Sequence, residues 1–167
     1  MASRRGVDGT KNARRNFSGE RSVGLEPEHA KSSLGYQIRY SYRAFVKALA
    51  AELNDTGITT SQWSALRVLW QEEGLSQVEI AQRMQVEKAS LTSVLAAMEA
   101  NKLIIRERED MDRRKSIIHL TPAGRELKRR LLPLGEKINA RATRGISSSD
   151  VRRLNELLSL VTTNLSK

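Results

Sequence analysis

Cysteine is absent from this chain of 167 residues, and its absence excludes several kinds of site. Without a thiol the chain can form no disulfide, no thiolate metal site, no cysteine nucleophile and no thiol redox switch. Its only histidines are His29 and His119, which lie on separate predicted elements, so a dedicated transition-metal site is not expected. We therefore expect neither a metal nor any other cofactor.

Long apolar runs and enzyme motifs are missing as well. No run of about 18 apolar residues is present, so we expect no membrane-spanning segment and no membrane partner. The N-terminus lacks the apolar stretch of a secretory signal, and the expected location is the cytoplasm. No nucleophile is paired with a base, and no glycine-rich phosphate loop occurs. We expect no catalytic residues and no enzyme.

Positive charge is what the chain has in excess. It contains 29 Lys and Arg residues against 19 Asp and Glu residues, for a formal net charge of +10. Such a balance favours a polyanionic partner, either nucleic acid or an acidic membrane surface. The charge alone does not distinguish a nucleic acid from a membrane surface as the partner, so the distinction rests on the motifs along the chain.

Residues 87–121 carry the most informative pattern. Four apolar residues recur at the spacing of one buried helix face, namely Leu91, Val94, Leu95 and Met98. The opposite face is small and weakly polar, so another surface can approach it closely. Asn101 is predicted to end this helix in the left-handed conformation. Residues 103–106 and 116–120 are then predicted strands joined by a charged loop, which makes a helix followed by a β-hairpin wing.

A second short helix precedes this one. Ser76 and Glu79 have the spacing of a capping box, in which each side chain satisfies a backbone amide of the first turn. Ile80, Ala81 and Met84 form its apolar face, and residues 85–87 are a predicted tight turn. Two short helices joined in this way match a helix-turn-helix, whose second helix lies in the DNA major groove. The alternative is an ordinary helical bundle, which leaves the charged hairpin unexplained.

The remaining boundaries follow from local signals. Residues 31–53 are a predicted helix, and Thr59 with Gln62 forms a second capping box that opens a helix to about residue 73. Leu75 is predicted to add a very short strand to the wing sheet. Thr121 is a predicted cap, with Pro122 at the first position of the next helix, where the missing amide costs nothing.

One motif connects the wing to this last helix. Asp112-Arg113-Arg114 is followed, after five residues, by Leu120-Thr121-Pro122-Ala123-Gly124. From about Gly35 onward, the chain resembles the MarR family of winged-helix transcription regulators, in which an Asp-Arg-Arg wing and a Leu-Thr-x-x-Gly exit recur together. Two positions depart from the family, which often has Gly at the position of Lys102 and a charged residue at that of Ile105.

The resemblance implies a sequence-specific transcriptional regulator that binds a palindromic operator as a homodimer and is released by a small ligand. The expected role is that of a repressor, with an activator as the open alternative. The expected fold class is mainly α with a small β-hairpin wing: a winged helix-turn-helix domain plus a helical dimerisation domain formed by both chain ends. The predicted divisions are a disordered basic tail at 1–30, a dimerisation helix at 31–56, the DNA-binding domain at 57–121 and dimerisation helices at 122–167. A competing interpretation is a ligand-independent, architectural DNA-binding protein.

The two chain ends differ in character. The tail is too poor in apolar residues to fold alone, although its arginines could instead contact DNA phosphates. These arginines are Arg4, Arg5, Arg14 and Arg15. At the other end an apolar seam repeats at close to heptad spacing and predicts a dimer interface. It consists of Val151, Leu154, Leu158, Val161 and Leu165.

Candidate DNA-binding residues lie on the second helix and on the wing. Small hydroxylic residues permit close approach and single hydrogen bonds in the major groove, which points to Lys88, Ser90, Thr92 and Ser93. The wing arginines Arg108, Arg113 and Arg114 suit a narrow minor groove, with a solvated turn as the alternative. By resemblance to the family, Asp112 steadies a neighbouring arginine.

Candidate ligand residues lie on the first two helices. The resemblance implies a small, often aromatic and anionic effector bound between the dimerisation helices and the winged domain. Rings for stacking and a guanidinium for a carboxylate are offered by Tyr36, Arg39, Tyr40, Arg43 and Trp63. The first four share one helix face, because their spacing is i, i+3, i+4 and i+7. They predict an aromatic carboxylate or its coenzyme A thioester, with a solvated basic face as the alternative.

Overall fold

The computed structural model describes residues 33–108 and 116–166. It divides into two compact units, Met1–Gln37 and Ile38–Lys167. In the first unit the described part is the start of helix α2 (Leu34–Leu53), where the Tyr36 backbone N–H donates to Ser33 Oγ at 3.2 Å. The predicted disordered tail and its arginines lie outside the described residues.

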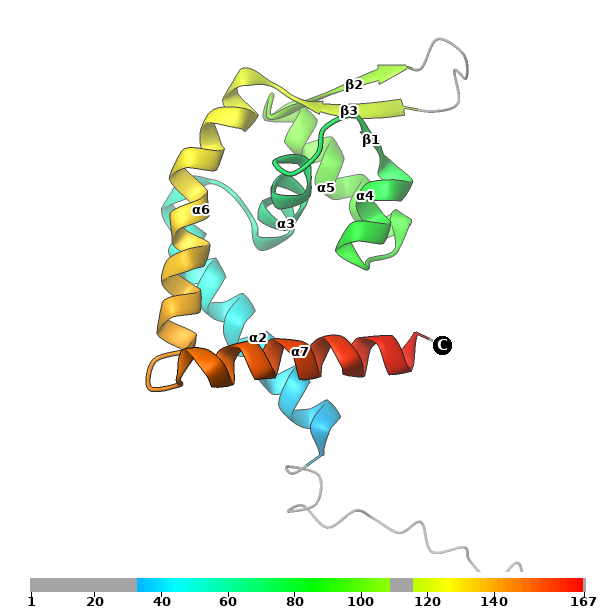
Figure 1. Cartoon of the computed structure of the whole chain (residues 1–167). Coiled ribbons are helices and arrows are strands. Elements are labelled where there is room, and N and C mark those ends of the chain that lie inside the picture. The colour runs from blue at the N-terminus through cyan, green and yellow to red at the C-terminus, as the bar shows by residue number, and fades with distance from the viewer. Residues whose placement is uncertain (1–32, 109–115, 167) are drawn as a thin grey trace, which may run out of the picture. The chain divides into compact units, whose positions relative to one another are not determined.

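The second unit contains the rest of α2, five further helices and a small antiparallel sheet (Figure 1). In chain order the elements after α2 are the 3-10 turn η1 (Asn54–Thr56), α3 (Thr60–Leu69), β1 (Leu75–Ser76), α4 (Gln77–Met84), α5 (Lys88–Ala100), β2 (Ile104–Arg108), β3 (Ser116–Leu120), α6 (Pro122–Ala142) and α7 (Ser148–Leu165). This architecture confirms the predicted fold class, mainly α with a β-hairpin wing.

Side-chain caps decide where the helices begin. Thr59 Oγ1 accepts from the Gln62 N–H at 3.2 Å, and Gln62 Oε1 accepts from the Thr59 N–H at 2.9 Å. The same reciprocal box joins Ser76 and Glu79 at the start of α4, and Thr121 caps α6. These predicted starts are confirmed. The predicted end of α3 was too late, because the helix stops at Leu69 before a turn that leads into β1.

The end of α5 differs from the prediction by one residue. Asn101 has a φ of −81°, whereas Lys102 has a φ of 55° and occupies the left-handed conformation. The Lys102 N–H bonds to Glu99 O and the Leu103 N–H bonds to Met98 O, both at 2.9 Å. This pair of bonds is a Schellman motif, which requires the left-handed residue one position beyond the cap. Lysine therefore occupies a conformation that favours glycine.

The sheet has the strand order β1-β3-β2, with antiparallel pairing throughout. Leu75 lies opposite Ile118, which confirms the predicted short strand. Strands β2 and β3 pair from Ile104 with Leu120 to Arg108 with Ser116 and form the arm of the wing (Figure 1). Strand β2 begins one residue later than predicted and extends two residues further.

The hydrophobic core lies among α3, α4, α5 and the sheet. Its most buried side chains include Leu66, Leu69, Ile80, Leu91, Leu95, Met98, Ile104 and Ile118. This set confirms the predicted buried face of α5. It leaves the opposite face of that helix exposed.

Gly124 shows why a glycine stands in the segment that leaves the wing. A Cβ at this position would lie 2.2 Å from the Leu103 carbonyl oxygen, a distance that no side chain tolerates. On the same turn, the indole N–H of Trp70 donates to the Gly124 carbonyl at 3.0 Å. Helix α6 therefore packs directly onto the backbone that precedes β2, and only glycine permits this approach.

Apolar surface is left uncovered on α7. No residue of this helix is buried, and Leu154, Leu158 and Leu165 of the predicted seam are 49%, 38% and 84% exposed. On α2, Ile38, Tyr42 and Phe45 are also exposed. Large apolar side chains gathered on one helix in this way favour a further covering surface.

Candidate nucleic-acid interface and adjoining cavity

Helix α5 presents its predicted DNA-binding residues on its outer face. Lys88, Ser90, Thr92 and Ser93 are all exposed. Ser90 Oγ donates to the Glu87 carbonyl at 2.7 Å, and Thr92 Oγ1 donates to the Lys88 carbonyl at 3.2 Å. Because these side chains are short and bonded back to their own helix, the backbone of α5 can approach another surface closely.

Helix α4 holds α5 through a residue that the sequence reasoning missed. Gln77 Nε2 donates to the Lys88 carbonyl at 3.0 Å and to Thr92 Oγ1 at 2.8 Å. The turn between the helices passes through Gln85, whose φ of 53° is left-handed. Gln77 and Thr92 are 15 positions apart, and no sequence signal connects them.

The wing is attached to α5 by an ion pair. Arg106 Nε on β2 lies 3.0 Å from Glu99 Oε2 near the end of α5. Arg108 is the last residue of β2 and pairs through its backbone with Ser116. Asp112, Arg113 and Arg114 lie outside the described residues.

The base of the wing carries a second connection that sequence reasoning did not predict. The Glu73 carboxylate accepts from Arg125 Nε at 2.8 Å, from Arg125 Nη2 at 2.7 Å and from the Leu120 N–H at 3.0 Å. The hydrogen bond from Arg125 is the main cause that lowers the pKa of Glu73, and the Leu120 N–H adds to it. These contacts join the segment before β1 to both β3 and α6.

A cavity of about 470 Å³ lies beside the helix-turn-helix in the second unit. Its apolar walls include Phe45, Val46 and Leu49 from α2 and Leu132 from α6. Polar side chains come from Thr60, Ser61, Ser64, Arg67, Glu136 and Asn139, and Tyr42, Trp63 and Ile138 also line it. Met84 at the end of α4 and Val86 in the following turn belong to the lining too, so an occupant would touch the helix-turn-helix itself.

One of the five predicted ligand residues lines this cavity. Trp63 does so, whereas Arg39, Tyr40 and Arg43 are exposed and outside the lining, and Tyr36 belongs to the first unit. The cavity uses the other face of α2, which the sequence reasoning assigned to packing. Helical spacing shows which residues share a face but not what the face meets, and the predicted ligand residues on α2 stay a prediction.

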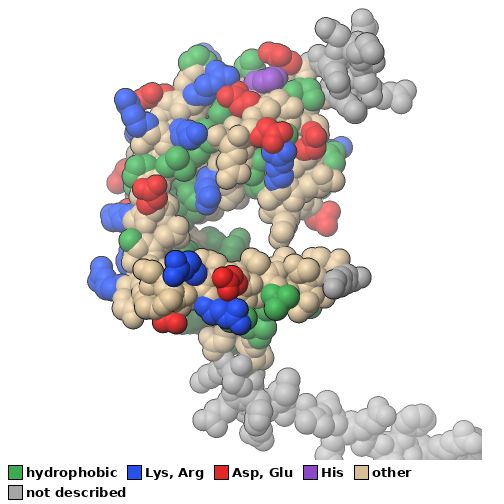
Figure 2. Space-filling view, in the orientation of Figure 1, with side chains coloured by type: hydrophobic (Ala, Val, Ile, Leu, Met, Phe, Trp, Pro, Cys, Tyr) green, Lys and Arg blue, Asp and Glu red, His purple; other side chains and the backbone are tan. Residues whose placement is uncertain are grey.

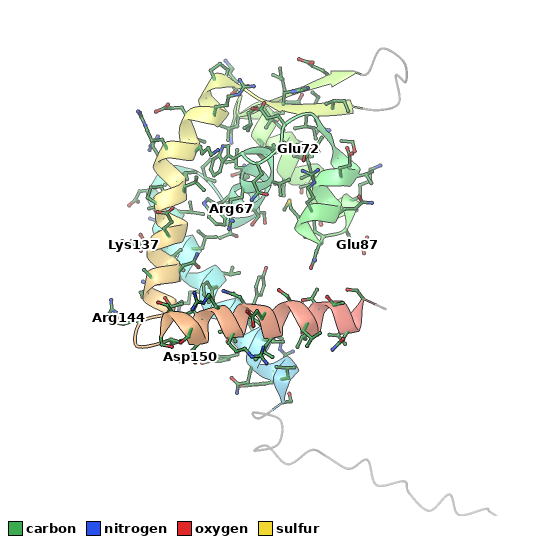
Figure 3. All side chains as sticks on the ribbon, in the orientation of Figure 1. Arg67, Glu72, Glu87, Lys137, Arg144 and Asp150 are labelled. Atoms are coloured by element: carbon green, nitrogen blue, oxygen red, sulfur yellow. The ribbon has the colours of Figure 1, made fainter. Side chains whose placement is uncertain are left out.

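Arg67 is a cationic residue in the lining of this cavity. It lies on α3 (Figure 3). Its Cζ is 5.0 Å from the centroid of the Trp63 ring. Arg67 has no carboxylate partner among the described residues, so its guanidinium is available to a ligand. The i, i+4 spacing from Trp63 is the sequence signal that would have found it.

Gly135 and Lys137 position α6 at the cavity. A Cβ on Gly135 would lie 2.9 Å from the Trp63 ring, so glycine makes room for the indole. Lys137 Nζ on α6 lies 2.9 Å from Glu52 Oε2 on α2. The Trp63 Nε1 atom is buried and has no hydrogen-bond acceptor among the described residues.

Residues 33–108 and 116–166 contain no cluster of three or more His, Cys, Asp or Glu side chains able to hold a metal ion. None of the helices described there is long and apolar enough to cross a membrane. On the face shown in Figure 2, Lys and Arg side chains are interspersed with Asp and Glu rather than gathered in one patch.

An exposed helix held by a helix-turn-helix and followed by a β-hairpin defines the winged helix-turn-helix class of transcriptional regulators, which are not enzymes. The MarR family model matches residues 58–116. The HTH-type transcriptional regulator TtmR of Methylorubrum extorquens (strain PA1) is 36% identical over 103 residues, which are 62% of this chain and 53% of TtmR. This chain thus spans about half the length of TtmR.

Two further relatives extend the match. The organic hydroperoxide resistance transcriptional regulator of Bacillus subtilis (strain 168) is 30% identical over 109 residues, or 64% of this chain and 74% of that protein. The structure of BpsR from Bordetella bronchiseptica, whose DNA binding is regulated by 6-hydroxynicotinic acid, is similar with a TM-score of 0.76. It shares 25% identity and covers 82% of this chain and 98% of BpsR. The chain belongs to the MarR family.

Proposed function

We propose that this protein is a transcriptional repressor that binds a palindromic operator as a homodimer and leaves it when an aromatic carboxylate binds. The observation that carries the proposal is the outer face of α5, where Lys88, Ser90, Thr92 and Ser93 are exposed on a helix that the wing adjoins. In this proposal α5 enters the major groove. Arg108, Arg113 and Arg114 bind the minor groove or phosphates, and Asp112 steadies a neighbouring arginine. The place of action is the cytoplasm.

The proposed dimer rests on the uncovered apolar face of α7. Leu154, Leu157, Leu158 and Leu160 are between 38% and 55% exposed, and a second copy of the chain would bury them. Burial of one such side chain is worth roughly 1.5–3 kcal/mol when it is complete. The segments 31–56 and 122–167 would form this dimerisation part. A two-fold dimer reads an inverted repeat with half-sites about one helical turn apart, roughly 10 bp.

The proposed ligand site is the cavity beside the helix-turn-helix. Its volume of about 470 Å³ lies in the usual range for small-molecule sites. Apolar walls suit an aromatic ring, and the Arg67 guanidinium over Trp63 suits a carboxylate. The effector of BpsR, 6-hydroxynicotinic acid, is such an aromatic carboxylate. A coenzyme A thioester would place its acyl group in the cavity.

Release of DNA follows from the position of the cavity. A ligand there would touch Met84 and Val86, which flank the turn that aims α5. The operator accepts one spacing of the two recognition helices, so a ligand that prefers another arrangement lowers DNA affinity. A hundredfold preference for that arrangement is worth about 2.7 kcal/mol.

Two arginine variants test the site. We expect Arg67→Ala to bind operator DNA like the wild type but to require much more aromatic acid for release, with Arg67→Lys intermediate. Arg43→Ala is the matched control, because it removes the same charge from α2 outside the cavity lining. Mobility shifts across a panel of aromatic carboxylates and their thioesters provide the first readout. Tryptophan fluorescence provides a second without DNA, since the chain has two tryptophans and one lines the cavity.

The outcomes separate the alternatives. If Arg43→Ala loses the response and Arg67→Ala keeps it, the ligand binds the other face of α2, where Arg39, Tyr40 and Arg43 lie. If no acid releases DNA or changes the fluorescence, the protein acts as a ligand-independent, architectural DNA-binding protein.

A further inference from the structure

Gln77 extends from the first turn of α4 to the first turn of α5. Its Nε2 lies 3.0 Å from the Lys88 carbonyl oxygen and 2.8 Å from Thr92 Oγ1. A carbonyl oxygen can only accept a hydrogen bond, so the end of the Gln77 side chain that faces Lys88 must be its nitrogen. That nitrogen carries two hydrogens, and the two acceptors use both of them.

The Thr92 hydroxyl is oriented by its contacts with Gln77 and with the Lys88 carbonyl. The hydroxyl oxygen is roughly tetrahedral. One of its four directions is the bond to Cβ, and the other three are occupied by one hydrogen and two lone pairs. The N–H of Gln77 takes one lone pair. The Lys88 carbonyl oxygen lies 3.2 Å away in a second direction, and only the hydroxyl hydrogen is favourable there. The third direction therefore holds a lone pair, so Thr92 offers an acceptor to any further partner.

Thr92 differs in this respect from the serines on the same helix. Ser90 Oγ is bonded to the Glu87 carbonyl, and Ser93 Oγ lies 3.5 Å from the Ser90 carbonyl. Neither serine hydroxyl receives a hydrogen bond from another element among the described residues. The hydrogen bonds of both serine hydroxyls stay within α5, whereas the Thr92 oxygen is also held from α4 by Gln77.

We propose that Gln77 is a positioning residue that holds the Thr92 oxygen in place, so that Thr92 acts as a hydrogen-bond acceptor in the major groove. Thr92 then selects a base with an amino group at its edge, adenine N6 or cytosine N4, and rejects guanine and thymine at the same place. Guanine N7 and O6 and thymine O4 are acceptors, and each would face a lone pair of Thr92. The inference rests on the proposed function, in which α5 lies in the major groove.

The expected effect is that of one hydrogen bond. A single neutral hydrogen bond of net 0.5–1.5 kcal/mol corresponds to about a two- to tenfold difference in affinity. The effect is confined to one base pair in each half-site. Phosphate contacts are unaffected, so the dependence of affinity on salt remains that of the wild type.

The test begins with the full-length protein and a library of random duplexes. Selection identifies the preferred sequence, and titration of duplexes changed at one base pair measures each preference. Thr92→Val keeps the shape of the side chain without its oxygen, so the base pair whose preference it loses is the one that Thr92 reads. Thr92→Ser keeps the oxygen and should keep the preference.

The decisive comparison is Gln77→Met at that base pair. This change keeps the length of the side chain and removes both donated hydrogen bonds. Without Gln77 the Thr92 side chain can turn to its other helical rotamer, which moves the oxygen away from the base edge. We therefore expect discrimination against guanine and thymine to fall about two- to tenfold while the salt dependence is unchanged. Gln82→Met on the same helix is the control, because the exposed Gln82 side chain makes no hydrogen bond among the described residues. It should keep the wild-type preference.

A base analogue tests the amino group directly and needs no variant. Purine in place of adenine, or 2-pyrimidinone in place of cytosine, lacks the amino group. Wild-type protein should bind this duplex about two- to tenfold more weakly, and Thr92→Val should not distinguish it. Equal wild-type affinity for the analogue would overturn the inference even if Gln77→Met failed to fold.

Two further results would count against the inference in different ways. Full discrimination by Gln77→Met would overturn the role of Gln77 while leaving the proposed function intact. Equal binding of the wild type to all duplexes would overturn the proposed function, and the inference with it.

Discussion

Replacement of Glu73 by glutamine tests the connection at the base of the wing. The carboxylate accepts three hydrogen bonds, two from Arg125 and one from the Leu120 N–H. Glutamine has one acceptor oxygen in place of two. Its amide N–H group would therefore face an N–H group of Arg125 or Leu120, and these two donors cannot bond to each other. The change therefore removes at least one hydrogen bond and also the negative charge that pairs with Arg125.

The expected loss of stability depends on how exposed the Glu73–Arg125 ion pair is. The side chains of Glu73 and Arg125 are 30% and 53% exposed, so water screens their attraction. An exposed ion pair contributes about 0.2–1 kcal/mol. An unsatisfied backbone N–H that is part-buried adds roughly 1 kcal/mol. We expect Glu73→Gln to reduce the free energy of unfolding by about 1–2 kcal/mol, which lowers the melting temperature by roughly 3–6 °C.

The effect should depend on pH in a defined direction. The hydrogen bond from Arg125 lowers the pKa of Glu73 below the usual value of a glutamate side chain, so the folded state favours the ionised carboxylate. This contribution to stability is fully present above the unfolded pKa and is lost as pH falls through the lower, folded pKa. The difference between wild type and Glu73→Gln should therefore be constant near neutral pH and shrink below about pH 4.5.

Thermal unfolding followed by circular dichroism at several pH values measures both quantities. Glu126→Gln is the control, because Glu126 pairs with Arg129 on the surface of one helix. It should change the free energy of unfolding by less than about 0.5 kcal/mol. Equal effects of the two variants at neutral pH, or a Glu73 effect that does not shrink in acid, would refute the reasoning.

Four other changes test the fold and the interfaces. Lys102→Gly should stabilise the protein by about 1 kcal/mol by relieving a left-handed lysine, whereas Asn101→Gly, at a φ of −81°, should give no gain in thermal unfolding. Gly124→Ala should destabilise it by several kcal/mol, since its Cβ would lie 2.2 Å from a backbone oxygen; unfolding in urea measures this. Leu158→Glu should shift light scattering toward monomer, and an unchanged dimer would remove α7 from the interface. Arg114→Ala should weaken binding to every duplex and reduce the salt slope by about one, which filter binding at several salt concentrations would show.

The sequence by itself determined the elements whose signals are local. The capping boxes at Thr59 and Ser76, the apolar period of α5 and the strands of the wing were all predicted, because each depends on residues within one or two turns. Together they were sufficient for the winged helix-turn-helix class. The left-handed residue at the end of α5 was predicted one position too early. The hydrogen bonds of the Schellman motif require Lys102 rather than Asn101 to have a positive φ, and these bonds cannot be read from the sequence.

Only the tertiary structure decided which distant residues meet. Glu73 and Arg125 are 52 positions apart, and Gln77 and Thr92 are 15 apart. Neither pair has a spacing that a single helix or strand imposes. The cavity was decided in the same way. Both faces of α2 carry aromatic residues, and the packing of α2 against α3 and α6 selects Tyr42 and Phe45 for its lining. A helical period reports which side chains share a face, but the neighbour of that face depends on how separate elements pack.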